Sequence, residues 1–170
     1  MKILASGLVI LSCGAMGLIV ASSYGKRVHN LRQLINFIQL LESEIQFART
    51  TLPTVISTHA TQFSGEVGRF LTILNEGLAG NTGQRFSAIW EDGVAKLSEN
   101  GLPQPVIEDL RSCGSVLGTS DAMEQSKHLK NLLARLEQAL SIAEGEREKQ
   151  TRLWQYLGFS AGLLIVLLLI

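Results

Sequence analysis

Cysteine and proline are scarce in this chain, and each scarcity excludes a group of folds. Only two cysteines, Cys13 and Cys113, and three prolines occur in 170 residues. The two cysteines lie in different regions and form no spaced pair, so the sequence suggests neither a disulfide framework nor a zinc site. With few prolines and little β-branched alternation, the sequence favours helices over strands.

The chain also lacks an excess of charge of either sign. Fifteen Lys and Arg are matched by fifteen Asp and Glu. Domains that bind nucleic acid usually carry a basic patch or stripe. The neutral balance therefore gives no sign of a nucleic-acid partner, and we expect none.

Patterns that indicate catalysis or cofactor binding are absent as well. There is no G-x-x-x-x-G-K-[ST] phosphate-binding loop. The three histidines, His29, His59 and His128, are widely spaced, and no two of them form an H-x-x-x-H pair. Cys113 has no histidine signature nearby and is better explained as a small buried apolar residue. We therefore expect no enzyme active site, no metal site and no cofactor.

What the chain does contain is an uncharged apolar stretch at each end. Residues 153–170 carry no charged side chain, and as a helix they would reach about 27 Å, close to the ~30 Å hydrocarbon core of a bilayer. Residues 3–24 are likewise uncharged. We predict transmembrane helices at residues 1–25 and 153–170, with one domain between them over residues 26–152.

Small residues are spaced along both apolar stretches in a way that suits helix packing. Gly7 and Gly14 lie seven positions apart in the first stretch, and Gly158 and Gly162 form a G-x-x-x-G in the second. Glycines at such positions let a neighbouring helix backbone approach closely. We therefore expect these four glycines to pack against other membrane helices.

Basic residues flank both stretches on the side of the middle domain. They are Lys26, Arg27 and Arg32 after the first stretch, and Arg147, Lys149 and Arg152 before the second. Because positive charge is enriched on the cytoplasmic side of a membrane, this pattern places the middle domain in the cytoplasm. The predicted topology is a hairpin in the cell membrane.

A cleaved signal peptide is the competing interpretation of the first stretch. Lys2 supplies a basic start and residues 21–23 (Ala-Ser-Ser) a small-residue cleavage site. A lipoprotein signal ending at Cys13 fits less well, because Leu11 is bulky for its position. The length of the stretch and its basic flank favour a retained helix, whereas a signal peptide would export the domain.

The middle domain shows helical periodicity throughout. Apolar residues recur at three- and four-residue steps and predict a helix over about 28–49; they are Leu31, Leu34, Ile35, Ile38, Leu41 and Ile45. Similar patterns follow, and the last helix begins near Ser120, a plausible N-cap. The predicted fold class is all-α, a cytoplasmic bundle of about six helices between an N-terminal and a C-terminal transmembrane helix.

Glu42 is the one carboxylate that falls inside the apolar stripe of the first of these helices. A carboxylate on a packing face needs a partner, so we expect Glu42 to meet an Arg or Lys of the bundle or of a partner protein. The alternative is that Glu42 borders the stripe and reaches water. Glu44 lies well off the stripe. We predict a partner interface that includes Glu42, Glu44 and Arg32.

Several segments resemble stage III sporulation protein AB along the whole chain. Those that carry the resemblance are residues 31–34 (LRQL), 41–45 (LESEI), 51–53 (TLP) and 157–164 (LGFSAGLL). One departure is visible, because the family turn usually reads T-P-L and Thr51 stands where its proline would be. The departure concerns the local geometry of the turn.

The resemblance implies a subunit of the channel complex between mother cell and forespore. The family domain is similar to the cytoplasmic domains of type II secretion inner-membrane platform proteins, which are helical bundles. The implied partners are a cytosolic secretion-type ATPase of the same sporulation system, other membrane subunits of the complex and the lipid bilayer.

Two functions of different classes follow from the sequence. The first is a non-enzymatic membrane platform that docks the ATPase from the mother-cell membrane around the forespore. The second is a membrane-anchored extracytoplasmic binding or sensor module, made with a cleaved signal segment. The side of the membrane on which the domain lies distinguishes the two.

Overall fold

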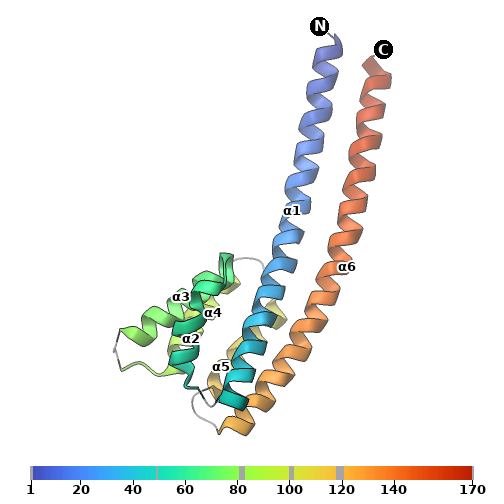
Figure 1. The fold of residues 1–170 in the computed structure, drawn as a ribbon. Coiled ribbons are helices and arrows are strands. Elements are labelled where there is room, and N and C mark those ends of the chain that lie inside the picture. The colour runs from blue at the N-terminus through green and yellow to red at the C-terminus, as the bar shows by residue number, and fades with distance from the viewer. Residues whose placement is uncertain (1, 49, 81–82, 100–101, 118–120, 170) are drawn as a thin grey trace. The chain divides into compact units, whose positions relative to one another are not determined.

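Six α-helices and two short helical turns make up the part of the chain that the structure describes. This computed structural model describes residues 2–48, 50–80, 83–99, 102–117 and 121–169, and gives the backbone alone for 2–22, 48, 154–155, 157–159 and 161–169. Over those residues it contains no strand. The elements, labelled in Figure 1, are α1 (Lys2–Ser43), the π-helix η1 (Glu44–Ala48), α2 (Leu52–His59), the 3₁₀ turn η2 (Ala60–Gln62), α3 (Gly65–Ala79), α4 (Phe86–Ser98), α5 (Gln104–Val116) and α6 (Ala122–Leu169).

The all-α fold class predicted from the sequence is confirmed. The chain divides into two compact units, the first formed by Met1–Val28 with Ser141–Ile170 and the second by His29–Leu140. Both α1 and α6 contribute residues to both units. The predicted domain boundaries at residues 25/26 and 152/153 stay predictions.

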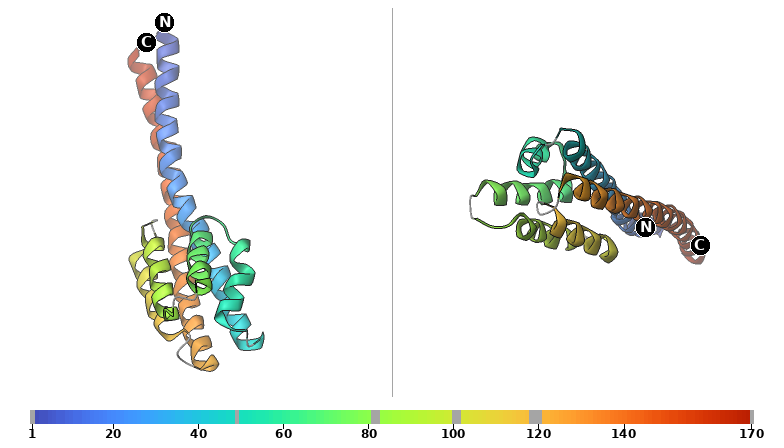
Figure 2. Two further views of the ribbon diagram at one scale, coloured as in Figure 1. Left: turned by 90° about the vertical axis from the view of Figure 1, so that its left-hand side faces the viewer. Right: turned by 90° about the horizontal axis from the view of Figure 1, so that it is seen from below.

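The second unit is built around the apolar stripe that the sequence placed on α1. All six stripe residues named above are buried, as is Phe37 between them. The remaining helices pack their own buried faces in sequence order, so that α3 lies beside α4 and α4 beside α5 (Figure 2). This serial packing suits antiparallel helices joined by short loops.

Aromatic rings form a continuous line through this core. Phe37 packs edge-on against Phe63 and Phe70, with ring centroids 5.8 Å and 6.2 Å apart, and Phe70 packs edge-on against Trp90 at 5.1 Å. The indole Nε1 of Trp90 donates a hydrogen bond to the carbonyl oxygen of Leu110, 2.8 Å away. Buried Trp and Tyr usually need such a partner for their polar atom. The line therefore ties α1, α3, α4 and α5 together.

Glycine makes room for the tryptophan. A Cβ added at Gly114 on α5 would lie 2.0 Å from Cδ1 of Trp90, far inside van der Waals contact. A Cβ added at Gly93 on α4 would likewise lie 2.7 Å from Cδ2 of Phe70. Because Gly114 and Gly93 have no side chain, α5 packs close to α4 and α4 packs close to α3.

Local sequence explains where the shorter helices begin and end. Thr51 precedes α2 in extended conformation and Pro53 lies in its first turn, where a proline is well tolerated. Asp121 caps α6, because its Oδ1 accepts a hydrogen bond of 2.8 Å from the backbone N–H of Glu124. The sequence had suggested Ser120 for this role, and Ser120 lies outside the described residues.

The structure differs from the sequence prediction in how the first helix runs. The sequence predicted a transmembrane helix over residues 1–25 and a second helix over about 28–49. Instead α1 is continuous from Lys2 to Ser43, and its last turn widens into the π-helix η1. Gly25 does not break the helix, because a single glycine weakens a helix by only about 1 kcal/mol.

In the first unit, α1 and α6 are joined by an ion pair. Arg27 on α1 donates a hydrogen bond from Nη1 to Oε2 of Glu146 on α6, at 3.0 Å. Along α6 itself, Arg152 pairs with Glu148 at 2.7 Å.

Within the residues whose side chains are described, no helix combines the length and apolar character needed to cross a membrane. The two predicted transmembrane helices fall largely outside those residues.

Candidate partner interface

Glu42 lies at the junction of α1 and α6 within the second unit. Its side chain is only 14% exposed, and its Oε1 accepts a hydrogen bond of 2.8 Å from the hydroxyl of Ser126. The ammonium of Lys130 lies 3.5 Å from the same oxygen. The expectation that Glu42 meets a cation of the bundle is confirmed. Its predicted place in a partner interface stays a prediction.

Glu44 closes the end of the first long helix. Its carboxylate accepts a hydrogen bond of 2.8 Å from the hydroxyl of Thr50, and its carbonyl oxygen accepts one of 3.3 Å from the Thr50 backbone N–H. Both contacts fix the chain as it leaves η1. Arg32 is exposed on α1 and makes an interaction of its own. The partner roles of Glu44 and Arg32 also stay predictions.

A hollow lies beside Glu42, between η1 and the first turns of α6. Its volume is about 550 Å³, and it is lined by Ile45, Gln46, Ala122, Met123, Ser126, Lys127, Lys130 and Asn131. The charged side chains that line it are both lysines. A second cavity of about 600 Å³ adjoins it through Ile45 and Ala122, and its other walls are mainly apolar, including Leu52, Pro53, Leu78 and Phe86.

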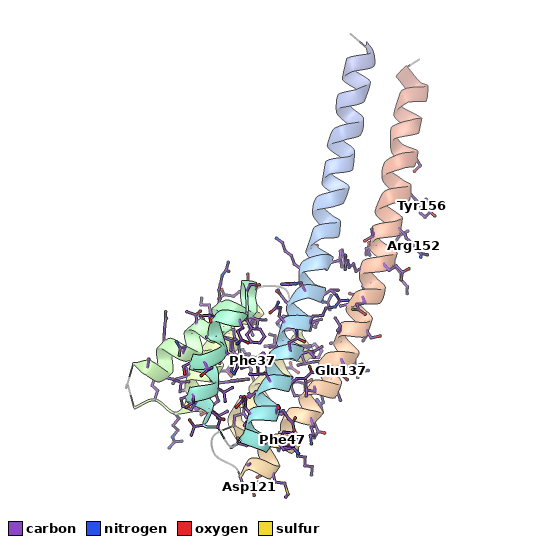
Figure 3. The ribbon with its side chains drawn as sticks, in the orientation of Figure 1. Phe37, Phe47, Asp121, Glu137, Arg152 and Tyr156 are labelled. Carbon is purple, nitrogen blue, oxygen red and sulfur yellow. The ribbon has the colours of Figure 1, made fainter. Side chains whose placement is uncertain are left out.

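Two large apolar side chains are exposed at the same end of the unit. Phe47 on η1 is 77% exposed and Met123 on α6 is 83% exposed. Figure 3 shows Phe47 and Asp121 at this end, where η1 and the start of α6 lie together. Large exposed apolar groups grouped beside a hollow mark an interaction surface more often than single scattered ones do.

Sequence reasoning missed this hollow, although the exposure of the two apolar side chains beside it can be read from the sequence. At 100° per residue, Phe47 falls roughly opposite the buried stripe of its helix and Met123 falls well off the stripe of α6. An aromatic residue on the polar face at a helix end indicates exposure. The hollow itself depends on two segments far apart in the sequence and has no local signal.

The surroundings of Cys113 disfavour the thiolate form of its side chain. Cys113 is buried, and burial raises the pKa of its thiol to about 12, so the reactive thiolate is scarce at neutral pH. A small pocket of about 230 Å³ touches it, and nearby Arg135 forms an ion pair with Asp109. The interpretation of Cys113 as a small buried apolar residue is confirmed.

Among the described residues, no three or more His, Cys, Asp or Glu side chains are grouped so that they could hold a metal ion. The glycines predicted to pack membrane helices lie in α1 (Gly7, Gly14) and α6 (Gly158, Gly162). What surrounds them lies outside the described residues, so their packing role stays a prediction.

The observed architecture is that of an all-α bundle protein whose first and last helices are also its longest, at 42 and 48 residues. Comparison with known proteins makes the class specific. The profile of the stage III sporulation protein AB family matches residues 2–170. The chain belongs to this family, and the resemblance drawn from the sequence is confirmed.

Individual relatives agree with the family match. Stage III sporulation protein AB of Bacillus subtilis (strain 168) is 31% identical to the chain over 170 residues, covering 99% of each. A solved structure of a stage III sporulation protein AB superposes with a TM-score of 0.66 at 28% identity, covering 73% of this chain and 98% of that one. The chain is therefore a sporulation protein.

Proposed function

We propose that the chain is a non-enzymatic platform subunit of the sporulation channel complex between mother cell and forespore. It lies in the mother-cell membrane around the forespore, held by transmembrane helices at residues 1–25 and 153–170. The bundle faces the cytoplasm and docks the cytosolic secretion-type ATPase of the same system. The family membership supports the sporulation role.

The observation that carries the proposal is the continuity of α1 and α6. Each helix includes an apolar end stretch and also supplies buried residues to the second unit, for example Leu34 on α1 and Leu136 on α6. An unbroken helix transmits displacement along its axis, because backbone hydrogen bonds join each turn to the next. A bundle attached in this way suits a subunit that links a motor to membrane partners.

The chemistry of the described side chains supports interaction rather than catalysis. Burial raises the pKa of the Cys113 thiol, whereas a nucleophilic cysteine needs a lowered pKa. The carboxylates of Glu42 and Asp109 are engaged in ion pairs with lysine and arginine. These contacts hold helices together, and Phe47 and Met123 leave apolar surface exposed at the end of the bundle for a partner.

The test is binding between the full-length chain and the purified ATPase of the same system. The chain is reconstituted in lipid nanodiscs and titrated with the ATPase, and saturable binding is expected. A nanodisc carrying an unrelated membrane protein is the control. If the wild-type chain binds no better than this control, the platform function is wrong.

A further inference from the structure

The two units carry opposite charge balances, although the whole chain is neutral. The first unit, Met1–Val28 with Ser141–Ile170, holds six of the fifteen basic residues and three of the fifteen acidic ones, which leaves nine and twelve for the second. The basic residues of the first unit are Lys2, Lys26, Arg27, Arg147, Lys149 and Arg152, and its acidic residues are Glu144, Glu146 and Glu148. All except Lys2 lie beside the inner ends of the apolar stretches, so an excess of positive charge accompanies these ends.

The three carboxylates of the first unit are each engaged. Glu146 accepts a hydrogen bond of 3.0 Å from an arginine of α1, and Glu148 pairs with Arg152 one turn later on α6, at 2.7 Å. Glu144 also makes an interaction of its own. Lys149, in contrast, is exposed and forms no ion pair within the described part of the chain. Positive charge is therefore left over just before the second apolar stretch.

Lys149, Arg152 and Tyr156 share one face of α6. Their spacing of three and four residues places them on successive turns of the same side of the helix, and Figure 3 shows Arg152 and Tyr156 pointing away from α1. Leu153 borders this face and is 52% exposed, while Tyr156 is 75% exposed. Lys149, Arg152, Leu153 and Tyr156 are called the outer face of α6 below. Their exposure leaves all four side chains accessible to a ligand.

The order of chemical groups along the outer face of α6 matches that of a phospholipid. The two cations come first, then the amphipathic ring of Tyr156, and residues 157–170 carry no charge. Arg152 and Lys149 precede Tyr156 by about 6 Å and about 10 Å along the helix axis. The headgroup layer of a bilayer is about 5–8 Å thick, and tyrosine rings are enriched there. The cations therefore lie at and just outside the headgroup level when the uncharged stretch occupies the hydrocarbon core.

We propose that the outer face of α6 binds an anionic phospholipid, with the phosphate between Lys149 and Arg152 and the acyl chains along Leu153 and the uncharged residues that follow. This inference rests on the membrane location in the proposed function and adds a ligand and its site. A guanidinium binds phosphate through two parallel hydrogen bonds, and an ammonium binds it as a point charge. Glu148 does not compete strongly for Arg152, because the two side chains are 67% and 69% exposed and such pairs contribute little.

The test compares two spin-labelled lipids in phosphatidylcholine vesicles that carry the full-length chain. Electron spin resonance gives the fraction of each lipid whose motion the protein restricts. The wild type is expected to prefer phosphatidylglycerol over phosphatidylcholine, whose headgroup has a cation of its own. Lys149→Gln lowers this preference by at least about twofold, whereas Lys149→Arg keeps it, because a basic residue near a membrane surface attracts anionic lipid. The preference of the wild type shrinks as salt is raised.

Glu148→Gln provides a change of opposite sign at the neighbouring position. It removes the carboxylate that Arg152 contacts, so the guanidinium is free for the phosphate and the preference for phosphatidylglycerol rises. The matched control is Lys127→Gln, which removes an exposed lysine from the part of α6 that belongs to the second unit and leaves the preference unchanged. If Lys149→Gln and Glu148→Gln both keep the wild-type preference, the site is wrong.

The same vesicles separate this inference from the function on which it rests. Flotation on a density gradient shows whether the chain is held in the membrane. If the wild type floats with the vesicles but restricts both lipids equally, the lipid site is wrong and the membrane location stands. If it does not float with them, both fall. Circular dichroism of each variant is expected to show an intact fold, because Lys127, Glu148 and Lys149 are exposed.

Discussion

At the scale of single residues, the structure shows that a substitution at Glu42 affects the fold itself, because Glu42 contacts Ser126 and Lys130 within the bundle. Glu42→Lys places a second ammonium beside Lys130, in a site where the native side chain is 14% exposed. We expect a loss of about 1–3 kcal/mol in the free energy of unfolding, since Ser126 also loses its acceptor. Urea denaturation of the full-length chain in detergent measures the loss.

The charge-swapped double variant, Glu42→Lys with Lys130→Glu, is the matched control. It restores opposite charges at the same positions and should recover part of the lost stability. A single variant as stable as the wild type would contradict a role for the pair in the fold. If assembly with the ATPase fails in the single variant and stays lost in the double variant, the native charges at positions 42 and 130 act in binding the partner and not only in the fold.

A second prediction at this scale concerns two glycines in helices. Gly114→Ala drives a Cβ to within 2.0 Å of Trp90, so the ring or the helix must shift, and the free energy of unfolding falls by about 1–3 kcal/mol. Gly145→Ala meets no atom within 4 Å and should raise it by about 0.5–1 kcal/mol. Thermal unfolding and tryptophan fluorescence, which reports the Trp90 environment, check both. Equal effects of the two substitutions would contradict the packing described.

The third prediction follows from the buried thiol. Burial raises the pKa of Cys113 from its ordinary 9.0 to about 12, so the unfolded chain loses this proton at lower pH than the folded chain. Stability is therefore full below about pH 9 and falls between about pH 9 and 12, by about 1.4 kcal/mol per pH unit from this group. The free energy of unfolding, measured against pH, falls less steeply in Cys113→Ala than in the wild type. Parallel curves above pH 9 would contradict it.

At the scale of elements, the continuity of α1 is the feature to test. Gly25→Pro removes a backbone N–H donor and clashes with the preceding turn, which kinks or breaks a helix interior at about 3 kcal/mol or more. Gly25→Ala keeps the helix, since an added Cβ meets no atom within 4 Å. If α1 couples its apolar stretch to the bundle, the proline variant makes few heat-resistant spores and the alanine variant makes a normal number.

The melting temperature of the bundle shows whether a sporulation defect of Gly25→Pro comes from the broken helix or from an unfolded bundle. The second unit starts at His29, after the substituted position, so its packed core should remain. A variant that unfolds as a whole would make the spore count uninformative about coupling, and circular dichroism detects this. Normal sporulation with a folded but broken helix would contradict the coupling role.

At the scale of the whole molecule, the side of the membrane on which the bundle lies separates the two functions drawn from the sequence. Cys113 is a poor probe because it is buried and its pKa is raised. Ser57 is exposed on α2, so Ser57→Cys with Cys13→Ser offers a reachable thiol. A membrane-impermeant thiol reagent should label it only after the cells are opened. Labelling of intact cells would instead favour the extracytoplasmic module.

Much of the fold follows from the sequence because helices are local. The stripe from Leu31 to Ile45 and the first turn of α2 at Pro53 were predictable from spacing and backbone chemistry, and both are observed. The continuity of α1 through Gly25 was not, since the charge pattern changes there while the helix does not. Nor was η1, whose i→i+5 geometry leaves no reliable trace in residue spacing.

The sequence by itself determined the helical class, the apolar ends and the place of Glu42 inside an apolar stripe, because each depends on residues close together along the chain. The family followed from segments spread over the whole length of the sequence. Only the tertiary structure decided that the cation beside Glu42 is Lys130, that Gly114 accommodates Trp90, and that Phe47 and Met123 stand beside one hollow. These contacts join α1 to α6 or α4 to α5. They arise when separate helices pack, and packing depends on the shapes of all the surfaces that meet.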